Sequence, residues 1–246
     1  MPKLLLTLLL ASLSLHNTQA ADTDFATAFA AAATPEEQGL VIAVEADRRD
    51  TGFNDSTADL EMLLRNKQGE ESLRELRSKT LEVEGDGDKS LTIFDRPADV
   101  KGTALLTFSH KTGNDDQWLY LPALKRVKRI ASNNKSGPFM GSEFAYEDIS
   151  SQEVEKYTYK YLRDEDLDGQ AAFVFERYPV DKKSGYTRQV VWMDKENFRD
   201  LKIDYFDRKN APLKTLVMSG YQQYLDKYWR ADVMFMENQP DRRAHV

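Results

Sequence analysis

Apolar and polar residues alternate along most of the chain after about residue 52, and such alternation predicts β-strands. In the first of these runs, one face carries Ala58, Leu60, Met62 and Leu64. Similar runs recur to about residue 235 and are separated by turns rich in glycine, asparagine and aspartate. Their spacing predicts about ten or eleven strands in one mainly β domain, arranged as a meander-type sandwich or barrel.

A short helix is predicted before the strands. Thr34 can cap its N-terminus, Pro35 suits its first position, and Glu37 completes a capping box. Leu40 and Val44 would then form its apolar face. The pattern therefore predicts a mainly β protein with short helices.

Residues 1–20 have the pattern of a cleavable signal peptide. Lys3 precedes an apolar run that is shorter than the about 20 residues of a membrane span, and small residues mark cleavage after Ala20. We therefore expect a secreted protein with a single domain over residues 21–246. Its alanine-rich beginning, residues 21–34, is weakly patterned and is expected to be frayed.

Composition narrows the possible functions. The chain has no cysteine, which excludes disulfides, thiolate metal sites, a lipid-modified cysteine and a cysteine nucleophile. Its net charge of −7 argues against nucleic-acid binding, which requires a basic face. Among three histidines, His16 would leave with the signal peptide and His245 lies in the tail, so only His110 could act as a general base. We therefore predict a non-enzymatic protein without cofactor or metal, with a hydrolase as the weaker alternative.

One acidic segment partly matches a calcium-binding loop. Residues 164–169 place acids at the first, third and fifth positions and glycine at the sixth. The twelfth position, which should supply a bidentate carboxylate, is Phe175. Because Asp-Gly is a strong hairpin signal, we favour a solvated turn at Asp168-Gly169 and keep calcium binding as a hypothesis.

Residues 118–150 interrupt the alternation. An aromatic strand leads into the densest positive cluster of the chain, which consists of Lys125, Arg126, Lys128 and Arg129. This cluster fits a charged strand that discourages edge pairing. It equally fits a docking surface for an acidic partner or for anionic lipid headgroups.

Residues 131–150 contain two glycines and a proline among bulky apolar residues, which is typical of a long functional loop or lid. The predicted lid residues are Phe139, Met140, Phe144 and Tyr146. Burial of each such side chain contributes about 1.5–3 kcal/mol, so they will not remain in water. They either fill the core of the protein or cover a ligand cavity, and the pattern leaves both possibilities open.

The same region resembles the outer-membrane lipoprotein-sorting protein family, which is related to the periplasmic lipoprotein carrier LolA. The resemblance rests on 118–122 (WLYLP), 125–130 (KRVKRI), 137–144 (GPFMGSEF) and 146–148 (YED). It implies an incomplete antiparallel β-barrel around an apolar cavity, with a lid of short helices and loops. It also implies periplasmic transport of lipid-modified cargo towards the outer membrane, often beside an inner-membrane transporter of the RND type. The arginine important for release in LolA carriers has no matching motif here, and the cargo does not carry over.

We therefore predict a periplasmic carrier that binds the acyl chains of a lipoprotein or lipid. The residues expected to line its cavity are Leu60, Met62, Leu64, Trp118, Tyr120, Trp192 and Met218. The basic cluster would dock a partner, and membrane contact would be transient at most. The alternative is a binding or sensor module of the same fold, with a core filled by residues 137–146, that assists a transporter.

Overall fold

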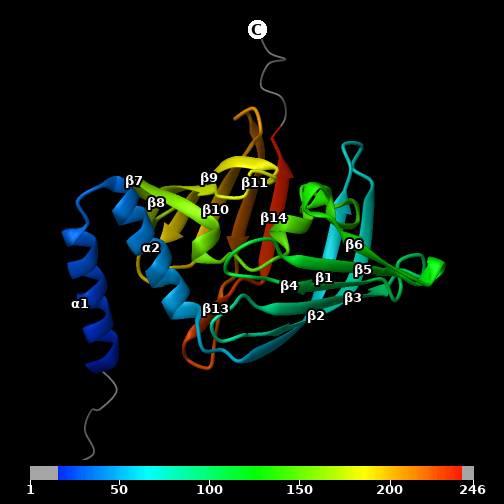
Figure 1. Cartoon of the computed structure of the whole chain (residues 1–246), viewed down its shortest axis with the longest axis horizontal. Helices are drawn as coiled ribbons and strands as arrows, with labels where there is room; N and C mark the ends of the chain where they lie inside the picture. The colour runs from blue at the N-terminus through cyan, green and yellow to red at the C-terminus, as the bar shows by residue number, and fades with distance from the viewer. Residues whose placement is uncertain (1–15, 240–246) are drawn as a thin grey trace, which may run out of the picture.

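The computed structural model describes residues 16–239. Most of the expected signal peptide, together with His245, lies outside the described residues. Two antiparallel sheets curve towards each other and form the two halves of an incomplete barrel (Figure 1). This architecture confirms the predicted fold class.

Each sheet has six strands, and every strand pairs with neighbours in an antiparallel sense. The first sheet contains, in spatial order, β1 (Asp55–Arg65), β2 (Glu71–Leu81), β3 (Lys89–Arg96), β4 (Ala104–Phe108), β5 (Asp116–Leu121) and β6 (Arg126–Ile130). The second sheet contains, in spatial order, β14 (Val233–Asn238), β11 (Pro212–Ser219), β10 (Asp200–Asp207), β9 (Tyr186–Asp194), β8 (Gln170–Pro179) and β7 (Tyr157–Leu167). A separate hairpin is formed by β12 (Gln222–Tyr224) and β13 (Tyr228–Arg230).

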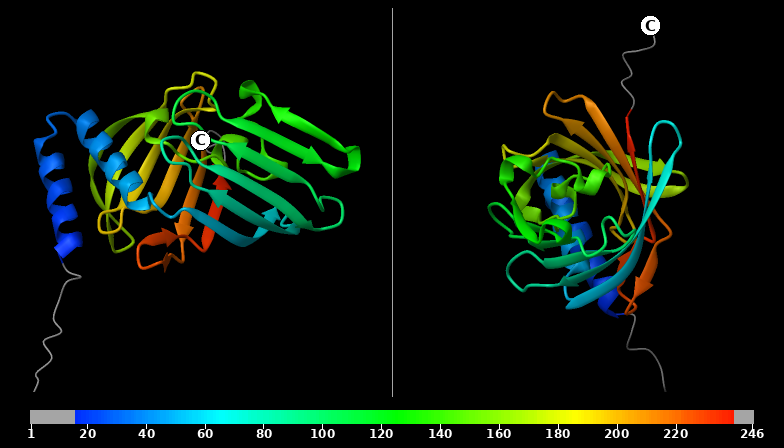
Figure 2. Two further views of the ribbon diagram at one scale, coloured as in Figure 1. Left: turned by 60° about the horizontal axis from the view of Figure 1, so that its bottom comes forward. Right: turned by 90° about the vertical axis from the view of Figure 1, so that its right-hand side faces the viewer.

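Residues 16–239 thus contain fourteen strands, more than the alternation predicted. The additional strands are short: β12 and β13 have three residues each, and β6 is the segment that the sequence left open as a charged strand. The edge strands β1 and β14 lie side by side but belong to different sheets, so the barrel is not closed (Figure 2).

Helix α2 (Pro35–Asp50) begins where the capping signals predict. The Thr34 hydroxyl accepts a hydrogen bond from the Glu37 amide at 3.2 Å, and the Glu37 carboxylate accepts one from the Thr34 amide at 3.1 Å. Local chemistry therefore determines this boundary before any tertiary contact is made.

The predicted apolar face of α2 is wrong. Leu40 and Val44 are 45% and 48% exposed, whereas Ile42 is completely buried. The reason is Gly39, where an added Cβ would lie only 2.8 Å from the backbone nitrogen of Lys160 in β7. The missing side chain lets the helix backbone rest on the strand, and this contact sets which face of the helix is buried.

The segment expected to be frayed, residues 21–34, is instead largely helical and belongs to α1 (His16–Ala31). Its aromatic side chains attach it to the second sheet: the Phe25 ring lies 4.8 Å from that of Phe198 and 5.7 Å from that of Phe173. Tertiary packing thus overrides weak helical patterning. Within the described part of the chain, neither helix combines the length and apolarity needed to cross a membrane.

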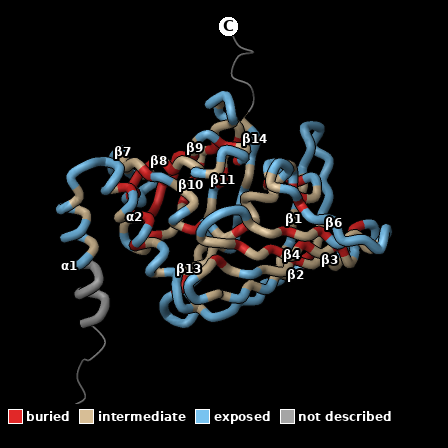
Figure 3. The backbone as a smooth tube through the Cα atoms, viewed as in Figure 1, coloured by how far each residue is buried: buried red, intermediate tan, exposed pale blue. Residues whose placement is uncertain are grey.

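Buried residues concentrate in the strands of both sheets (Figure 3), and the central strands β8 and β9 carry buried residues on both faces. The first-sheet cluster consists of Leu76, Phe94, Val100, Leu105, Leu119, Ile130 and Phe139. The second-sheet cluster consists of Ile42, Ala43, Tyr159, Phe173, Phe175, Tyr186, Val191, Met193, Phe198, Ile203, Tyr205 and Leu216. Side-chain alternation places the remaining residues of the central strands on the outer faces.

The acidic segment 164–169 forms the β7–β8 hairpin turn. Asp168 and Gly169 have φ values of 53° and 85°, and the flanking residues pair directly across the hairpin. The preferred interpretation as an Asp-Gly turn is therefore confirmed. Among residues 16–239, no group of three or more histidine, aspartate or glutamate side chains could hold a metal ion.

Candidate functional site

The connection between the two sheets folds into the barrel instead of running over its surface (Figures 1 and 2). Between β6 and β7 it contains the short helical turns η2 (Ser132–Asn134), η3 (Phe139–Gly141) and η4 (Tyr146–Asp148). Residues 137–148, called the plug here, form a compact loop held by hydrogen bonds within the loop. The Phe139 amide donates to the Phe144 carbonyl at 2.6 Å, and Pro138 and Ala145 form an isolated antiparallel bridge.

Phe139 is the apolar centre of the plug. It is 1% exposed, and its ring lies 5.8 Å from that of Phe94 on β3 and 5.7 Å from that of Tyr146. Phe144 packs against both the first-sheet and the second-sheet clusters. The plug therefore occupies the space between the two half-barrels with its own aromatic side chains.

The first sheet holds the plug through neutral backbone atoms. The Arg74 guanidinium of β2 donates to the Met140 carbonyl and lies 6.0 Å from the Phe94 ring. Gln117 of β5, which is 3% exposed, donates to the Tyr146 carbonyl at 2.9 Å. On this side, apolar packing and two hydrogen bonds to carbonyl groups fix the plug.

The second sheet holds the plug through buried charge. Lys214 of β11 contacts the Asp148 carboxylate at 2.6 Å, with side-chain exposures of only 4% and 6%. Lys214 also donates to the Glu143 carbonyl at 2.7 Å, and the Tyr186 hydroxyl donates to Asp148 at 2.9 Å. Burial and the negative charge of Asp148 raise the pKa of Tyr186, which keeps its hydroxyl a donor. Both members of the ion pair therefore have a further hydrogen-bond partner, which offsets part of the cost of burying the two charges.

Glu147 extends this anchor. Its carboxylate accepts hydrogen bonds from the Ser184 hydroxyl and the Gly185 amide, both at 2.8 Å. Burial raises the pKa of Glu147 above its ordinary value of 4.5. A Cβ at Gly185 would lie 2.6 Å from that of Ser136 and 2.9 Å from the Glu147 carboxylate, so this close approach requires glycine.

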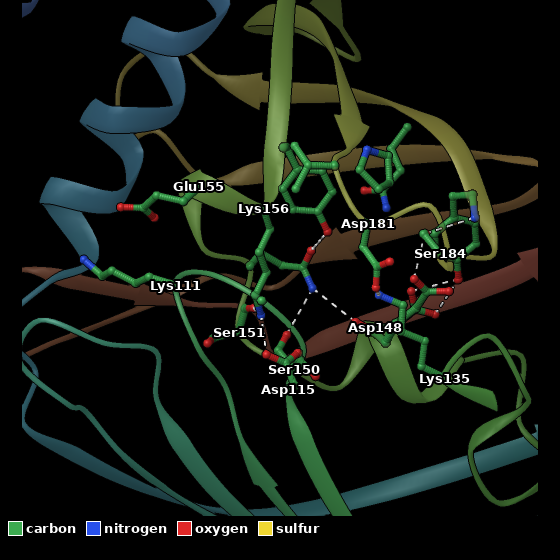
Figure 4. A pocket seen from close by; sticks show the side chains of 18 residues that line it. Lys111, Asp115, Lys135, Asp148, Ser150, Ser151, Glu155, Lys156, Asp181 and Ser184 are labelled. Atoms are coloured by element: carbon green, nitrogen blue, oxygen red, sulfur yellow. Dashed lines mark hydrogen bonds and ion pairs between the residues drawn. The ribbon is translucent and has the colours of Figure 1, made fainter. Parts of the chain in front are cut away.

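A small polar cavity lies beside the anchor (Figure 4). Its volume is about 60 Å³, and its lining includes the ion pairs Lys135–Asp181 at 2.6 Å and Lys156–Asp115 at 2.7 Å. This volume accommodates about two water molecules, whereas pockets for organic ligands usually measure about 300–1,000 Å³. An acyl chain does not fit this cavity, so an apolar ligand would have to enter where the plug now lies.

The structure brings several predicted cavity and lid residues together. Leu60 and Met62 of β1 pack against the first-sheet cluster, as do Met140 and Phe144. Leu64 follows on the same face of β1 and is half-buried. Met218 packs against the second-sheet cluster, as Phe144 does. Tyr146 joins the first-sheet cluster with the other lid residues.

Three predicted lining residues lie on the outer faces, which corrects the expected strand facing. Leu119 faces inwards from β5, so its neighbours Trp118 and Tyr120 face outwards, where Trp118 pairs with Leu106. Trp192 belongs to a cluster on the outer face of the second sheet, and its indole donates to Glu165 at 3.1 Å. Because the side-chain period of a strand is two, an error of one residue places a side chain on the opposite face.

The basic cluster forms an exposed edge of the first sheet. Lys125 precedes β6, and Arg126, Lys128 and Arg129 lie in it. Because β6 pairs only with β5, it is a charged edge strand of the first sheet, and docking of a partner there stays a prediction. Arg129 forms an ion pair with Asp116.

The residues that hold the plug were missed by sequence reasoning, although one signal was present. Lys214 shares its face of β11 with Leu216 and Met218, and a lysine on an inward face indicates a buried ion pair. Glu147 and Asp148 gave no such signal, because adjacency of two acids along the chain says nothing about their burial.

Known proteins resemble this chain in both sequence and structure. A family model described as an uncharacterized protein matches residues 86–245. A structure of an outer membrane lipoprotein-sorting protein domain from Vibrio parahaemolyticus is 64% identical, with a TM-score of 0.81, and the alignment covers 82% of this chain and 86% of that one. A DUF1329 family protein from Desulfovibrio piger is 34% identical, with a TM-score of 0.79 and coverage of 83% and 87%.

A LolA superfamily protein from Nitrosomonas europaea shares the fold at 20% identity, with a TM-score of 0.66 and coverage of 83% of this chain and 87% of that one. A search of curated proteins gave no match. The fold and the sequence similarity thus point to the same group of proteins.

Proposed function

Because this chain belongs to the family of outer-membrane lipoprotein-sorting proteins and shares the fold of a LolA superfamily protein, we propose that it is a periplasmic carrier for the acyl chains of a lipoprotein or lipid. The observation that supports this proposal is the plug. This irregular loop places the side chain of Phe139, which is only 1% exposed to solvent, at the centre of the barrel. In the proposed mechanism, an acyl chain displaces this side chain and takes its place.

The energetics of such an exchange are nearly balanced. Complete burial of Phe139 and partial burial of Met140 and Phe144 contribute together up to about 9 kcal/mol. An acyl chain that buries about ten methylene groups gains about 8 kcal/mol, at about 0.8 kcal/mol each. A ligand can therefore open the plug without binding irreversibly, which is what a carrier requires.

The inner wall exposed by plug movement suits a flexible chain. It includes Leu60, Met62 and Leu64 of β1 and Met218 of β11, on both sides of the gap between the sheets. Methionine side chains adapt to irregular apolar ligands because they are unbranched and polarizable. In this proposal Trp118, Tyr120 and Trp192 do not line the cavity, since they lie on the outer faces.

Directional transfer needs a partner. Affinity for the acyl chain alone cannot give direction, so another protein must change the equilibrium between the plugged and open states. An inner-membrane transporter of the RND type, implied by the family resemblance, would fill this role.

The filled interior also favours a second candidate. In a binding or sensor module of the same fold, the plug would be a permanent part of the core and a protein partner would be the only ligand. The cavity of about 60 Å³ is consistent with that function.

Native mass spectrometry of the protein, purified from the periplasm without detergent and then extracted with organic solvent, separates the two candidates. The carrier is expected to show an added mass that corresponds to a lipid or acylated peptide. A mass of the protein alone, together with no uptake of a fluorescent fatty acid, would contradict the carrier and favour the binding module.

A further inference from the structure

The hairpin of β5 and β6 ends at one extremity of the molecule (Figures 1 and 2). Its turn is the short helix η1 (Pro122–Leu124), and Lys125 closes it with a left-handed backbone at φ 49°. Residues 120–129 are called the hairpin tip here. The tip stands clear of the plug and of the second sheet, so its side chains are available to a partner.

The hairpin tip exposes apolar side chains. Leu124 is 64% exposed, Val127 63% and Tyr120 38%. Tyr120 pairs with Val127, so these two side chains share one face, and Trp118 follows two residues along the same face. Adjacent exposed apolar and aromatic residues of this kind are typical of an interaction site.

Positive charge surrounds these residues on a protein whose net charge is −7. Lys125, Arg126 and Lys128 are exposed, and none of them forms an ion pair with a residue in the described range 16–239. Strand alternation turns Arg126 and Lys128 to the face opposite Val127 and Arg129. The unpaired Arg126 and Lys128 therefore lie on the face opposite Tyr120 and Val127, Lys125 lies in the turn, and Arg129 on the other face is paired with Asp116.

This arrangement favours a membrane over a folded protein. A flat partner protein that covered the apolar face of the hairpin would leave Arg126 and Lys128 on the opposite face in water. A lipid headgroup layer that the tip enters end-on surrounds both faces at once. Tryptophan and tyrosine prefer the interfacial region, while lysine and arginine side chains extend to the phosphates.

We propose that the hairpin tip is a membrane-contact surface that binds anionic phospholipid headgroups. The few cations make this contact reversible and sensitive to salt. It deepens the proposed carrier function, because a carrier of acyl chains has to meet a membrane, but the contact itself needs no cargo.

Vesicle flotation of the full chain tests this surface. The protein should float with vesicles of phosphatidylethanolamine and phosphatidylglycerol, should not float with vesicles of phosphatidylcholine alone, and should dissociate at high salt. The triple variant Lys125→Glu, Arg126→Glu, Lys128→Glu should bind at least roughly 100-fold more weakly, since each cation near an anionic surface contributes about fivefold.

A matched triple variant separates the effect of charge at the hairpin tip from the effect of net charge on vesicle binding. Lys182→Glu, Lys183→Glu and Lys209→Glu change the net charge by the same amount in exposed loops of the second sheet. This control should float like the original protein. Equal loss of binding in both triple variants, or no flotation of the unchanged protein, would overturn the proposal.

A single cysteine locates the contact, because the chain has none of its own. A polarity-sensitive dye at Leu124→Cys should shift to shorter wavelengths with anionic vesicles, and the same dye at Val180→Cys should not. Val180 is similarly exposed, at 56%, but lies at the end of β8. A shift at both positions, or only at position 180, would contradict insertion of the tip.

Uptake of a fluorescent fatty acid without vesicles distinguishes this proposal from the carrier function. The triple variant at the tip should retain the uptake of the original protein. Flotation without any uptake would reject the carrier and leave the membrane surface standing, whereas uptake without flotation would reject the surface alone.

Discussion

The two sheets hold the same plug by different kinds of interaction. The first sheet uses apolar packing around Phe139 and hydrogen bonds to backbone carbonyls. The second sheet uses the buried Lys214–Asp148 ion pair and the hydrogen-bonded Glu147 carboxylate. In the proposed carrier, an apolar ligand would compete directly with the first set of contacts and leave the second intact. We therefore expect the plug to swing on a charged anchor while its aromatic end is displaced.

The largest expected effect comes from breaking the charged anchor. Lys214→Ala leaves the Asp148 carboxylate buried without its partner and should lower the free energy of unfolding by about 3–5 kcal/mol. Chemical denaturation measures this change. The double variant Lys214→Met, Asp148→Leu removes both charges and should recover most of the loss. A loss from Lys214→Ala below about 1 kcal/mol would mean that the pair does not anchor the plug.

Removing the apolar end of the plug tests the other side. Phe139→Ala should lower the free energy of unfolding by about 3 kcal/mol, the low end for a buried phenylalanine, because the loop can collapse. It should also increase the affinity for a fluorescent fatty acid roughly tenfold or more, because the plug competes less well.

Phe175→Ala is the matched control for this variant. Phe175 is 2% exposed in the second-sheet cluster and belongs to β8. Its truncation should cost at least as much stability, because a central strand cannot collapse as a loop can, and should give no gain in affinity. If both variants weaken fatty-acid binding to the same extent, the plug is not a competitor of the ligand.

A smaller effect is expected at the close approach of Gly185. Gly185→Ala pushes a methyl group against Ser136 and the Glu147 carboxylate and should cost about 1–3 kcal/mol of stability. Adding Ser136→Gly removes the 2.6 Å contact and should restore part of this loss in thermal or chemical denaturation. Full stability of Gly185→Ala would show that the anchor tolerates a shift of the loop.

The smallest effect is the pH dependence of the charged anchor. The pKa of Glu147 is raised by burial, so the folded protein binds its proton more tightly than the unfolded chain does. This contribution to stability is present at acidic pH and is lost as the pH rises from about the ordinary value of 4.5 through the raised pKa. Glu147→Gln should remove it, and the difference between the two stability curves should therefore widen in that window. A difference that stays constant with pH would contradict the raised pKa of Glu147.

The sequence predicts local features of this fold well, but it predicts poorly which face of a strand is buried. The capping box at Thr34 and Glu37 and the Asp-Gly turn are local, and both form as predicted. Strand facing in β5 is ambiguous from sequence, because Trp118 and Tyr120 are as apolar as their inward neighbour Leu119. Only the neighbouring strands decide which face is buried.

In the plug and its anchor, too, local features could be predicted from the sequence and long-range contacts could not. The resemblance in residues 118–148 identified the family, and the apolar loop was recognised as a lid or a core plug. The anchor could not be assembled from the sequence, since Lys214 and Asp148 are 66 residues apart. The helical packing of Phe25 and Phe29 in α1 was also missed, although their spacing of four residues places both side chains on one helix face.

Hydrogen exchange in the presence and absence of a fatty acid tests displacement of the plug most directly. The Phe139 amide, hydrogen-bonded to the Phe144 carbonyl, and the Tyr146 amide, hydrogen-bonded to the Gly137 carbonyl, are both protected in the plugged state. Ligand saturation should accelerate exchange in residues 137–146 while the central strand β9 stays protected. Unchanged or slower exchange in the plug at saturating ligand would contradict displacement and identify the plug as a permanent part of the core.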